Sequence, residues 1–154
     1  MLTFDVRAMR SGSVVTSATV PPEDAVFEGL EIALDGPVRV EGSLQAAGQG
    51  TFRWQGRVSG AGRGECSRCL SPVTSRFDVP AEALFSASPD TADDPGVYPL
   101  VEPVSVIDLS EPVREEVALA VPAFPLCREE CAGLCPHCGA DLNLGPCGCA
   151  GSPA

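Results

Sequence analysis

Three stretches of the chain alternate apolar and polar side chains with a period of two, which is typical of strands that bury one face. They are residues 37–44, 51–60 and 73–79. In the second stretch Phe52, Trp54 and Val58 fall on one face, and polar side chains fall on the other. Residues 46–50 and 60–72 are rich in glycine and predict tight connections, so we expect antiparallel hairpins.

The second half of the chain predicts a loop and then a short helix. Residues 86–103 are dominated by Pro, Asp and Ser, which is typical of a solvated loop. Residues 110–122 predict the helix, with Ser110 as its cap, Pro112 in the first turn and Pro122 as its stop. The pattern therefore favours an α+β fold, in which an antiparallel sheet of four to six strands carries one main helix.

Length and composition are those of a globular protein with a modest core. The chain has 154 residues, 44% apolar and 20% charged, which suggests one domain with a small appendage. Residues 1–20 place acidic and basic side chains where a signal peptide needs an apolar run, and no stretch predicts a membrane span. We expect a cytoplasmic protein, in which clustered cysteines bind metal or carry out redox chemistry.

All eight cysteines fall in two places, 65–70 and 125–149. Two pairs have the Cys-x-x-Cys spacing that presents two thiolates to one zinc ion, and the second, CPHCG, is typical of a zinc ribbon. Two further pairs are more loosely spaced, so that four pairs supply ligands for two structural zinc sites. The pairs are Cys66/Cys69, Cys135/Cys138, Cys127/Cys131 and Cys147/Cys149. We expect a sheet and helix domain over 1–124 and a zinc-binding tail over 125–154 packed on it.

The spacing leaves open which pairs share a metal. Eight residues separate Cys138 from Cys147, so the last four cysteines can close a site within the tail, while the first four clamp the tail to the hairpin. Alternatively, the two Cys-x-x-Cys pairs share one zinc ion, or one metal binds and the other thiols stay free. His137 is an alternative ligand in place of Cys149, but a histidine inside a Cys-x-x-Cys turn more often points to solvent, and we expect this for His137.

Enzyme functions find little support in the residues. A redox role for Cys66 and Cys69, with Arg68 lowering a thiol pKa, lacks the helix N-terminus that such sites use. A catalytic zinc ion keeps an open position, whereas these ligand sets are filled by cysteine. With one histidine in the chain, we find no Ser/His/Asp or Cys/His constellation. We therefore predict structural metal sites and no catalytic activity, and keep a thiol redox enzyme as an alternative.

The motif order resembles the bacterial YceD family, the large ribosomal RNA subunit accumulation proteins. ECSRCL after a strand, then IDLSEPVREEVALAVPAFPLC, then CAGLCPHCGADLNLGPCGC carry the resemblance, over about residues 35–149. It implies a role in the synthesis, processing or stability of 23S ribosomal RNA. This chain is similar to the branch with a cysteine-rich tail, in which the first four cysteines match the shared element and the last four are an addition.

The charge limits how such a protein meets RNA. The formal net charge is −11, and each zinc ion held by four thiolates adds about two negative charges. One segment is locally positive, since residues 53–76 contain five arginines and one acid. A possible RNA or partner contact is formed by Arg53, Trp54, Arg57, Arg63 and Arg68. The alternative is that these arginines form an ordinary solvated strand face.

The partner implied is the large-subunit rRNA precursor or a basic ribosomal protein, which would suit the acidic remainder of the chain. A third hypothesis is a zinc-stabilised regulator that uses the tail to bind nucleic acid. The tail argues against it, since Arg128 is the one fixed positive charge over 127–151, beside three acids.

Overall fold

The computed structural model describes residues 1–7, 9, 12–91 and 94–149, so residues 150–154 of the predicted tail lie outside it. Its strands are β1 Thr3–Asp5, β2 Ser13–Val20, β3 Ala33–Leu34, β4 Val38–Gly48, β5 Thr51–Glu65, β6 Pro72–Ser86, β7 Val97–Pro99 and β8 Val106–Asp108. Its helices are the α-helix α1 Ser110–Ala120 and the 3-10 turns η1 Ala25–Phe27 and η2 Pro89–Thr91.

The main sheet has the strand order β2-β4-β5-β6-β7, with β3 paired to β5, and β1 and β8 form a separate ribbon. All pairings are antiparallel except that of β6 with β7. The predicted α+β fold is confirmed. The prediction of a loop over 86–103 is wrong in part, because β7 adds a parallel strand to the sheet within it.

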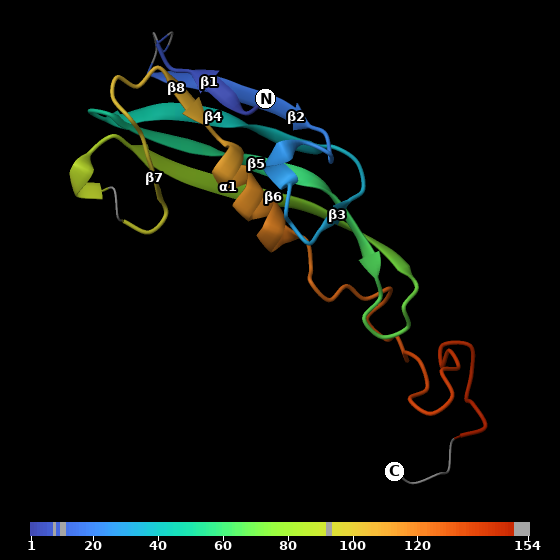
Figure 1. Cartoon of the computed structure of the whole chain (residues 1–154). Coiled ribbons are helices and arrows are strands. Elements are labelled where there is room, and N and C mark those ends of the chain that lie inside the picture. The colour runs from blue at the N-terminus through green and yellow to red at the C-terminus, as the bar shows by residue number, and fades with distance from the viewer. Residues whose placement is uncertain (8, 10–11, 92–93, 150–154) are drawn as a thin grey trace.

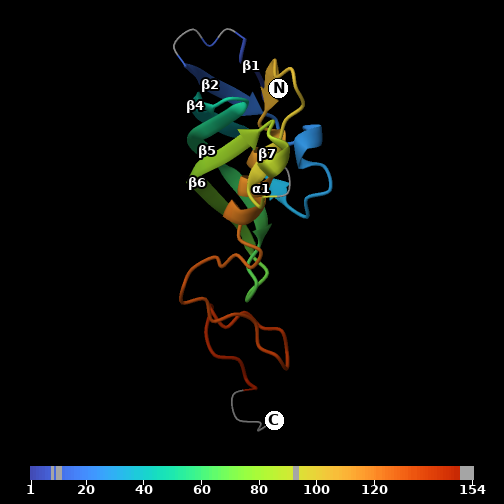
Figure 2. The same cartoon turned by 90° about the vertical axis from the view of Figure 1, so that its left-hand side faces the viewer.

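The described residues cover one face of the sheet. The helix α1, the turn η1 and the β1–β8 ribbon all lie on that face, and the opposite face is open to solvent (Figures 1 and 2). We call the covered side the inner face and the open side the outer face. No helix in the described ranges is long and apolar enough to cross a membrane.

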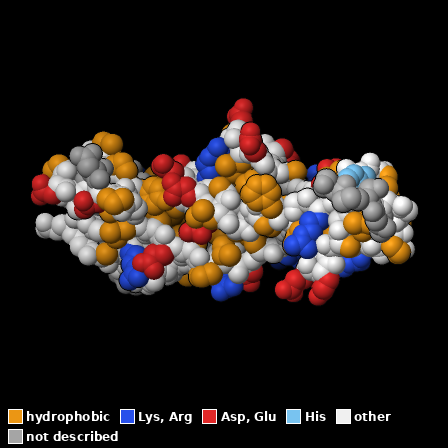
Figure 3. Space-filling model, turned by 90° about the horizontal axis from the view of Figure 1, so that it is seen from below, with side chains coloured by type: hydrophobic (Ala, Val, Ile, Leu, Met, Phe, Trp, Pro, Cys, Tyr) orange, Lys and Arg blue, Asp and Glu red, His pale blue; other side chains and the backbone are white. Residues whose placement is uncertain are grey.

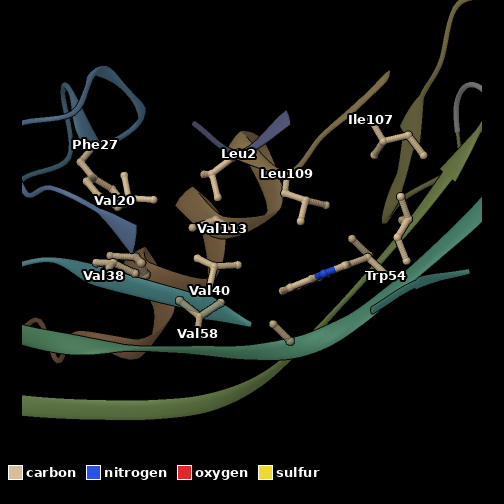
Figure 4. Close-up of a cluster of buried hydrophobic side chains, with 14 of the residues drawn as sticks. Leu2, Val20, Phe27, Val38, Val40, Trp54, Val58, Ile107, Leu109 and Val113 are labelled. Atoms are coloured by element: carbon tan, nitrogen blue, oxygen red, sulfur yellow. The ribbon is translucent and has the colours of Figure 1, made fainter. Parts of the chain in front are cut away.

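The core forms where α1 meets the inner face of β4 and β5 (Figure 4). The period-two pattern puts Val40, Trp54 and Val58 on this face, where Val113 and Val117 of the helix join them, and none of the five is measurably exposed. The indole Nε1 of Trp54 donates a hydrogen bond to the Thr16 hydroxyl at 2.8 Å. The one polar group of this large side chain is therefore satisfied inside the core.

Two glycines make room for the indole. Gly42 of β4 and Gly56 of β5 are directly paired, and a Cβ on Gly56 would lie 2.7 Å from Cζ2 of Trp54. Side chains at these positions would collide with the ring or with the neighbouring backbone, so the sheet closes around Trp54 only with glycine there.

The hairpin of β5 and β6 is longer than the alternation predicts. Its register runs from Thr51↔Ser86 to Glu65↔Pro72, so the segment 60–64, predicted as a tight connection, is strand. Its glycines serve packing, because a Cβ on Gly60 would lie 2.8 Å from the Phe77 ring and a Cβ on Gly62 would lie 2.6 Å from Val121. The hairpin thus runs beyond α1 and carries residues 66–71 at its tip (Figure 1).

The helix begins and ends close to its predicted limits, but the predicted cap is wrong. Ser110 is the first helical residue, Leu109 is the N-cap residue, and no side chain caps the helix. The Ser110 hydroxyl and amide both donate to the carboxylate of Asp108. Pro112 lies in the first turn as predicted, and the helix ends two residues before Pro122.

Candidate metal centres

The first Cys-x-x-Cys pair lies in the turn between β5 and β6. The Cys66 amide donates to the carbonyl of Ser71 at 2.8 Å, and the Leu70 amide donates to the carbonyl of Cys66 at 2.9 Å. Leu70 has a φ of 61°, in the left-handed region. This turn brings the Cys66 and Cys69 sulfurs to the same side of the hairpin tip.

The second pair repeats this turn within the tail. The Cys135 amide donates to the carbonyl of Ala140, and the Gly139 amide donates to the carbonyl of Cys135, both at 2.8 Å. Gly139 has a φ of 72° and occupies the position that Leu70 holds in the first turn. The two turns therefore share one backbone design, and the second has the residue that this geometry favours.

The first cluster joins the hairpin tip to the start of the tail. The Ser67 amide donates to the carbonyl of Pro125 at 2.9 Å, which brings the following cysteines beside the turn. The Sγ atoms of Cys66 and Cys131 are 3.8 Å apart. Those of Cys69 and Cys127 are 3.6 Å apart. All four sulfurs lie within 4.8 Å of one another.

The second cluster forms within the tail. The sulfurs of Cys135, Cys138, Cys147 and Cys149 lie within 4.8 Å of one another. A bridge between Leu134 and Asp141 closes the base of this loop. The sulfurs are thus grouped as the first of the three partitions predicts, and the two Cys-x-x-Cys pairs do not come together as the interleaved partition requires. His137 belongs to neither cluster and is exposed, as expected.

The donor set fits a tetrahedral metal ion. Metal–sulfur bonds of about 2.3 Å at tetrahedral angles put sulfurs about 3.8 Å apart. The two Sγ–Sγ distances of 3.6 and 3.8 Å match this spacing. A disulfide needs about 2.05 Å, and the eight cysteines are free thiols. Two clusters of four cysteines can therefore each hold one metal ion.

Backbone amides prepare one thiolate in each cluster. Amide hydrogen bonds, that of Cys127 first, lower the pKa of Cys66 to about 6. The amides of Cys138 and His137 lower the pKa of Cys135 to about 6. By contrast, burial first, and then hydrogen bonds with neighbouring thiols, raise the pKa of Cys127 to about 11. Without a cation, repulsion between neighbouring thiolates keeps the four thiols of a cluster from all ionising. A bound metal ion would favour the thiolate form of all four.

The two clusters are tied together through Arg68. Its guanidinium donates to the carbonyls of Glu129 and Cys131 at 3.3 and 3.0 Å, and its own carbonyl accepts from the Leu134 amide at 3.1 Å. Gly133 packs beneath it, because a Cβ there would lie 3.0 Å from the Arg68 carbonyl oxygen. Arg68, predicted as an RNA contact, thus connects the hairpin tip to the tail.

Asn143 is a site residue that the sequence patterns do not reveal. Its Nδ2 approaches the Cys131 sulfur at 3.5 Å, and its Oδ1 accepts from the Ala132 amide at 2.8 Å and from Arg128 at 2.7 Å. An amide that donates to a ligand sulfur orients the sulfur and tempers its charge. The spacer between Cys138 and Cys147 therefore supports the first cluster, although its neighbouring cysteines belong to the second.

The structure corrects the predicted contact patch. Trp54 is 0% exposed on the inner face, so it cannot stack on a base or meet a partner there. The arginines of β5 lie on the outer face beside acids. Figure 3, which views the molecule from below, shows positive and negative side chains adjoining at several places on that side. The ion pairs are Arg53–Glu82, Arg57–Asp78 and Arg63–Asp35. Their acids lie outside the segment 53–76, so the local excess of positive charge is largely matched across the sheet.

Replacing Leu70 by Gly is expected to stabilise the metal-loaded protein by about 0.5 to 1 kcal/mol. The left-handed conformation costs a residue with a Cβ about 1 to 2 kcal/mol. Glycine removes this cost, but it also raises the conformational entropy of the unfolded chain, which offsets part of the gain in stability. Leu70 is 59% exposed, so little packing is lost. Thermal unfolding of Leu70→Gly measures the gain, and Gly139→Leu is the matched reverse substitution. A less stable Leu70→Gly variant would show that the leucine side chain supports the turn.

Several known proteins are similar to parts of this chain. Uncharacterized proteins of Mycobacterium tuberculosis and Mycobacterium bovis are each 41% identical over 95 residues, which is 59% of this chain and 45% of the relative. An uncharacterized protein of Mycobacterium leprae is 28% identical over 152 residues, or 93% of this chain and 68% of the relative. The chain thus spans less than half of the first two relatives. No solved structure matches it.

Residues 54–154 match the family described as "Large ribosomal RNA subunit accumulation protein YceD". The matched part contains most of β5, all of β6 and α1, and every one of the eight cysteines. It covers well over half of the chain, and it includes both metal centres. The resemblance noted in the sequence is therefore confirmed, and the chain belongs to the YceD family of large ribosomal RNA subunit accumulation proteins.

Proposed function

We propose that this protein is a non-catalytic, cytoplasmic factor that supports the synthesis, processing or stability of 23S rRNA during assembly of the large ribosomal subunit. The observation that carries the proposal is the family match over residues 54–154, whose description names the accumulation of large-subunit rRNA. The matched part holds the hairpin tip and the tail, so the clusters belong to the portion of the molecule on which the family assignment rests.

Each cluster binds one zinc ion in this proposal. Four thiolates at tetrahedral spacing are the ligand set that zinc takes in structural sites, and with four protein ligands no position is left open for substrate. Zinc supplies folding free energy here, because its ligands come from segments that only the folded chain brings together. Residues 125–154 then form a tail held on the domain 1–124 by the first ion.

The partner in this proposal is the rRNA precursor itself. A basic ribosomal protein is the alternative, because the chain carries a net charge of −11 and its acids spread over many exposed positions. The two partners predict different complexes: the purified protein should carry RNA in one case and a basic protein in the other, and salt should weaken both. Native purification followed by identification of the bound RNA and protein separates them.

Deletion of the gene is expected to lower the ratio of 23S to 16S rRNA and the yield of mature large subunits. Expression of the intact chain should restore both, whereas Cys66→Ser should restore neither if the folded hairpin tip is required. Leu70→Gly, which keeps all ligands, is the matched control and should restore both. An unchanged rRNA ratio and a normal subunit profile in the deletion strain would contradict the proposed function.

A further inference from the structure

Two arginines on the outer face have no protein partner. Of the ten arginines, Arg10 lies outside the described residues, and seven of the other nine bind acids, carbonyls or an amide oxygen. The seven are Arg7, Arg53, Arg57, Arg63, Arg68, Arg114 and Arg128. Among the arginines in the described part of the chain, Arg39 and Arg76 are the two whose guanidinium groups make no hydrogen bond or ion pair. Both are exposed.

These two arginines line the same hollow. Arg39 of β4 lies opposite Ser59 of β5, and Arg76 of β6 lies opposite Ala61, two residues farther along β5. A period of two puts Ser59 and Ala61 on one face, so both guanidinium groups rise from the outer face on either side of β5. The hollow between them measures about 460 Å³, and Ser59 also lines it.

The side chains around the hollow carry a net positive charge, which favours binding of an anion. Asp78 also lines it, but its carboxylate already accepts from Arg57 at 2.8 Å. Glu41 lies on the same strand face as Arg39 and directly opposite Arg57. This part of the outer face therefore has three cations and two carboxylates: Arg39, Arg57 and Arg76 against Glu41 and Asp78. The two cations without an ion pair, Arg39 and Arg76, are those that line the hollow. An arriving anion would meet two guanidinium forks whose donors no protein group uses.

Phosphate is the anion that this arrangement suits. The guanidinium fork matches the oxygens of a phosphate in bidentate geometry, and the serine hydroxyl adds a third donor group beside the two guanidinium groups. The outer face of the sheet is open, so that an extended backbone can cross it (Figure 2). Trp54, the one tryptophan, is buried on the opposite face, which leaves backbone contact rather than indole stacking.

We infer that Arg39 and Arg76, together with Ser59, form a contact point for the phosphodiester backbone of RNA. The inference rests on the proposed function and goes beyond it, because it assigns the RNA a defined binding site on the protein. It also moves the contact away from the arginines of β5, whose donors are engaged by acids. Contacts of this kind position an RNA without reading its sequence.

The test is the double substitution Arg39→Gln/Arg76→Gln, with binding of a transcript of the 23S rRNA precursor measured at several salt concentrations. We expect the dissociation constant to rise on the order of tenfold, and the slope of log K against log salt to fall by about 1.4 to 1.8, as for two lost phosphate contacts. Circular dichroism and metal content should stay unchanged, because both side chains are exposed on the outer face and neither residue belongs to a cysteine cluster.

Arg53→Gln/Arg57→Gln is the matched control, since it removes the same charge from the same face. It should weaken binding less, because those guanidinium groups already bind Glu82 and Asp78. Equal weakening by both variants would indicate diffuse attraction and overturn the inference. Wild-type binding to polyglutamate but not to the transcript would assign the hollow to an acidic protein and also overturn it.

The outcomes separate this inference from the function on which it rests. If the deletion strain loses 23S rRNA but Arg39→Gln/Arg76→Gln binds the transcript like the wild type, only the contact point is wrong. If the deletion strain keeps a normal rRNA ratio, the proposed function is wrong whatever the binding constants are.

Discussion

Cys66→Ser is expected to destabilise the whole protein by about 4 kcal/mol, a lowering of the melting temperature of about 10 °C. Cys66 is fully buried at the point where the hairpin tip meets the tail, and it is one of the four sulfurs of the first cluster. Loss of this ligand weakens a metal whose binding free energy is folding free energy, about 10 to 16 kcal/mol for structural zinc. Thermal unfolding and metal content measure the effect.

Cys149→Ser is the matched control for this prediction. Cys149 belongs to the second cluster, whose four ligands all lie within the tail, so its loss should free one metal ion and leave the unfolding of the sheet unchanged. Equal destabilisation by the two substitutions would mean that the clusters fold as one unit, coupled through Arg68 and Asn143. It would contradict the separate roles assigned to them here.

The metal content of the purified protein is expected to be close to two zinc ions per chain when no chelator is present. A chelator should remove them in two steps. The second cluster should empty first, because it has one buried cysteine, Cys135, whereas the first cluster has two, Cys66 and Cys131. Each cluster has one exposed cysteine, so the difference lies in the buried ligands. Elemental analysis gives the stoichiometry, and circular dichroism during chelation follows the fold.

The first step should leave the strand signal intact, and the second should reduce it. Cys135→Ser provides the control, since it should carry one ion and show only the second step. Elemental analysis that returns one zinc ion or none for the wild type would contradict the two-site proposal, and so would a single-step release.

The local patterns predict the parts of the fold whose side chains alternate. The β4 and β5 strands were found because Val40, Trp54 and Val58 recur on one face, and the helix was found because Pro112 and Pro122 bracket it. The division of the cysteines was predictable as well, since eight residues of spacer let the last four close on themselves.

Other parts depend on contacts that no local pattern carries. The strand β2 escaped prediction because its alternation is interrupted: Thr16 is buried as the partner of the indole, while its neighbour Val15 is 81% exposed. The strand β7 has only three residues and takes its place by pairing with β6. The arginines of β5 looked free because their acids come from β6 and from Asp35, far along the chain.

The long β5 strand also decides where the protein can be shortened. The family match begins at Trp54, inside β5, yet residues 51–59 of that strand pair with β4 as well as with β6. A chain that started at Trp54 would lack Thr16, the hydrogen-bond partner of the indole, and would leave one edge of β5 bare. A fragment intended for expression should therefore begin before β2, and limited proteolysis should find no cut that separates the cysteine-bearing hairpin from the preceding strands.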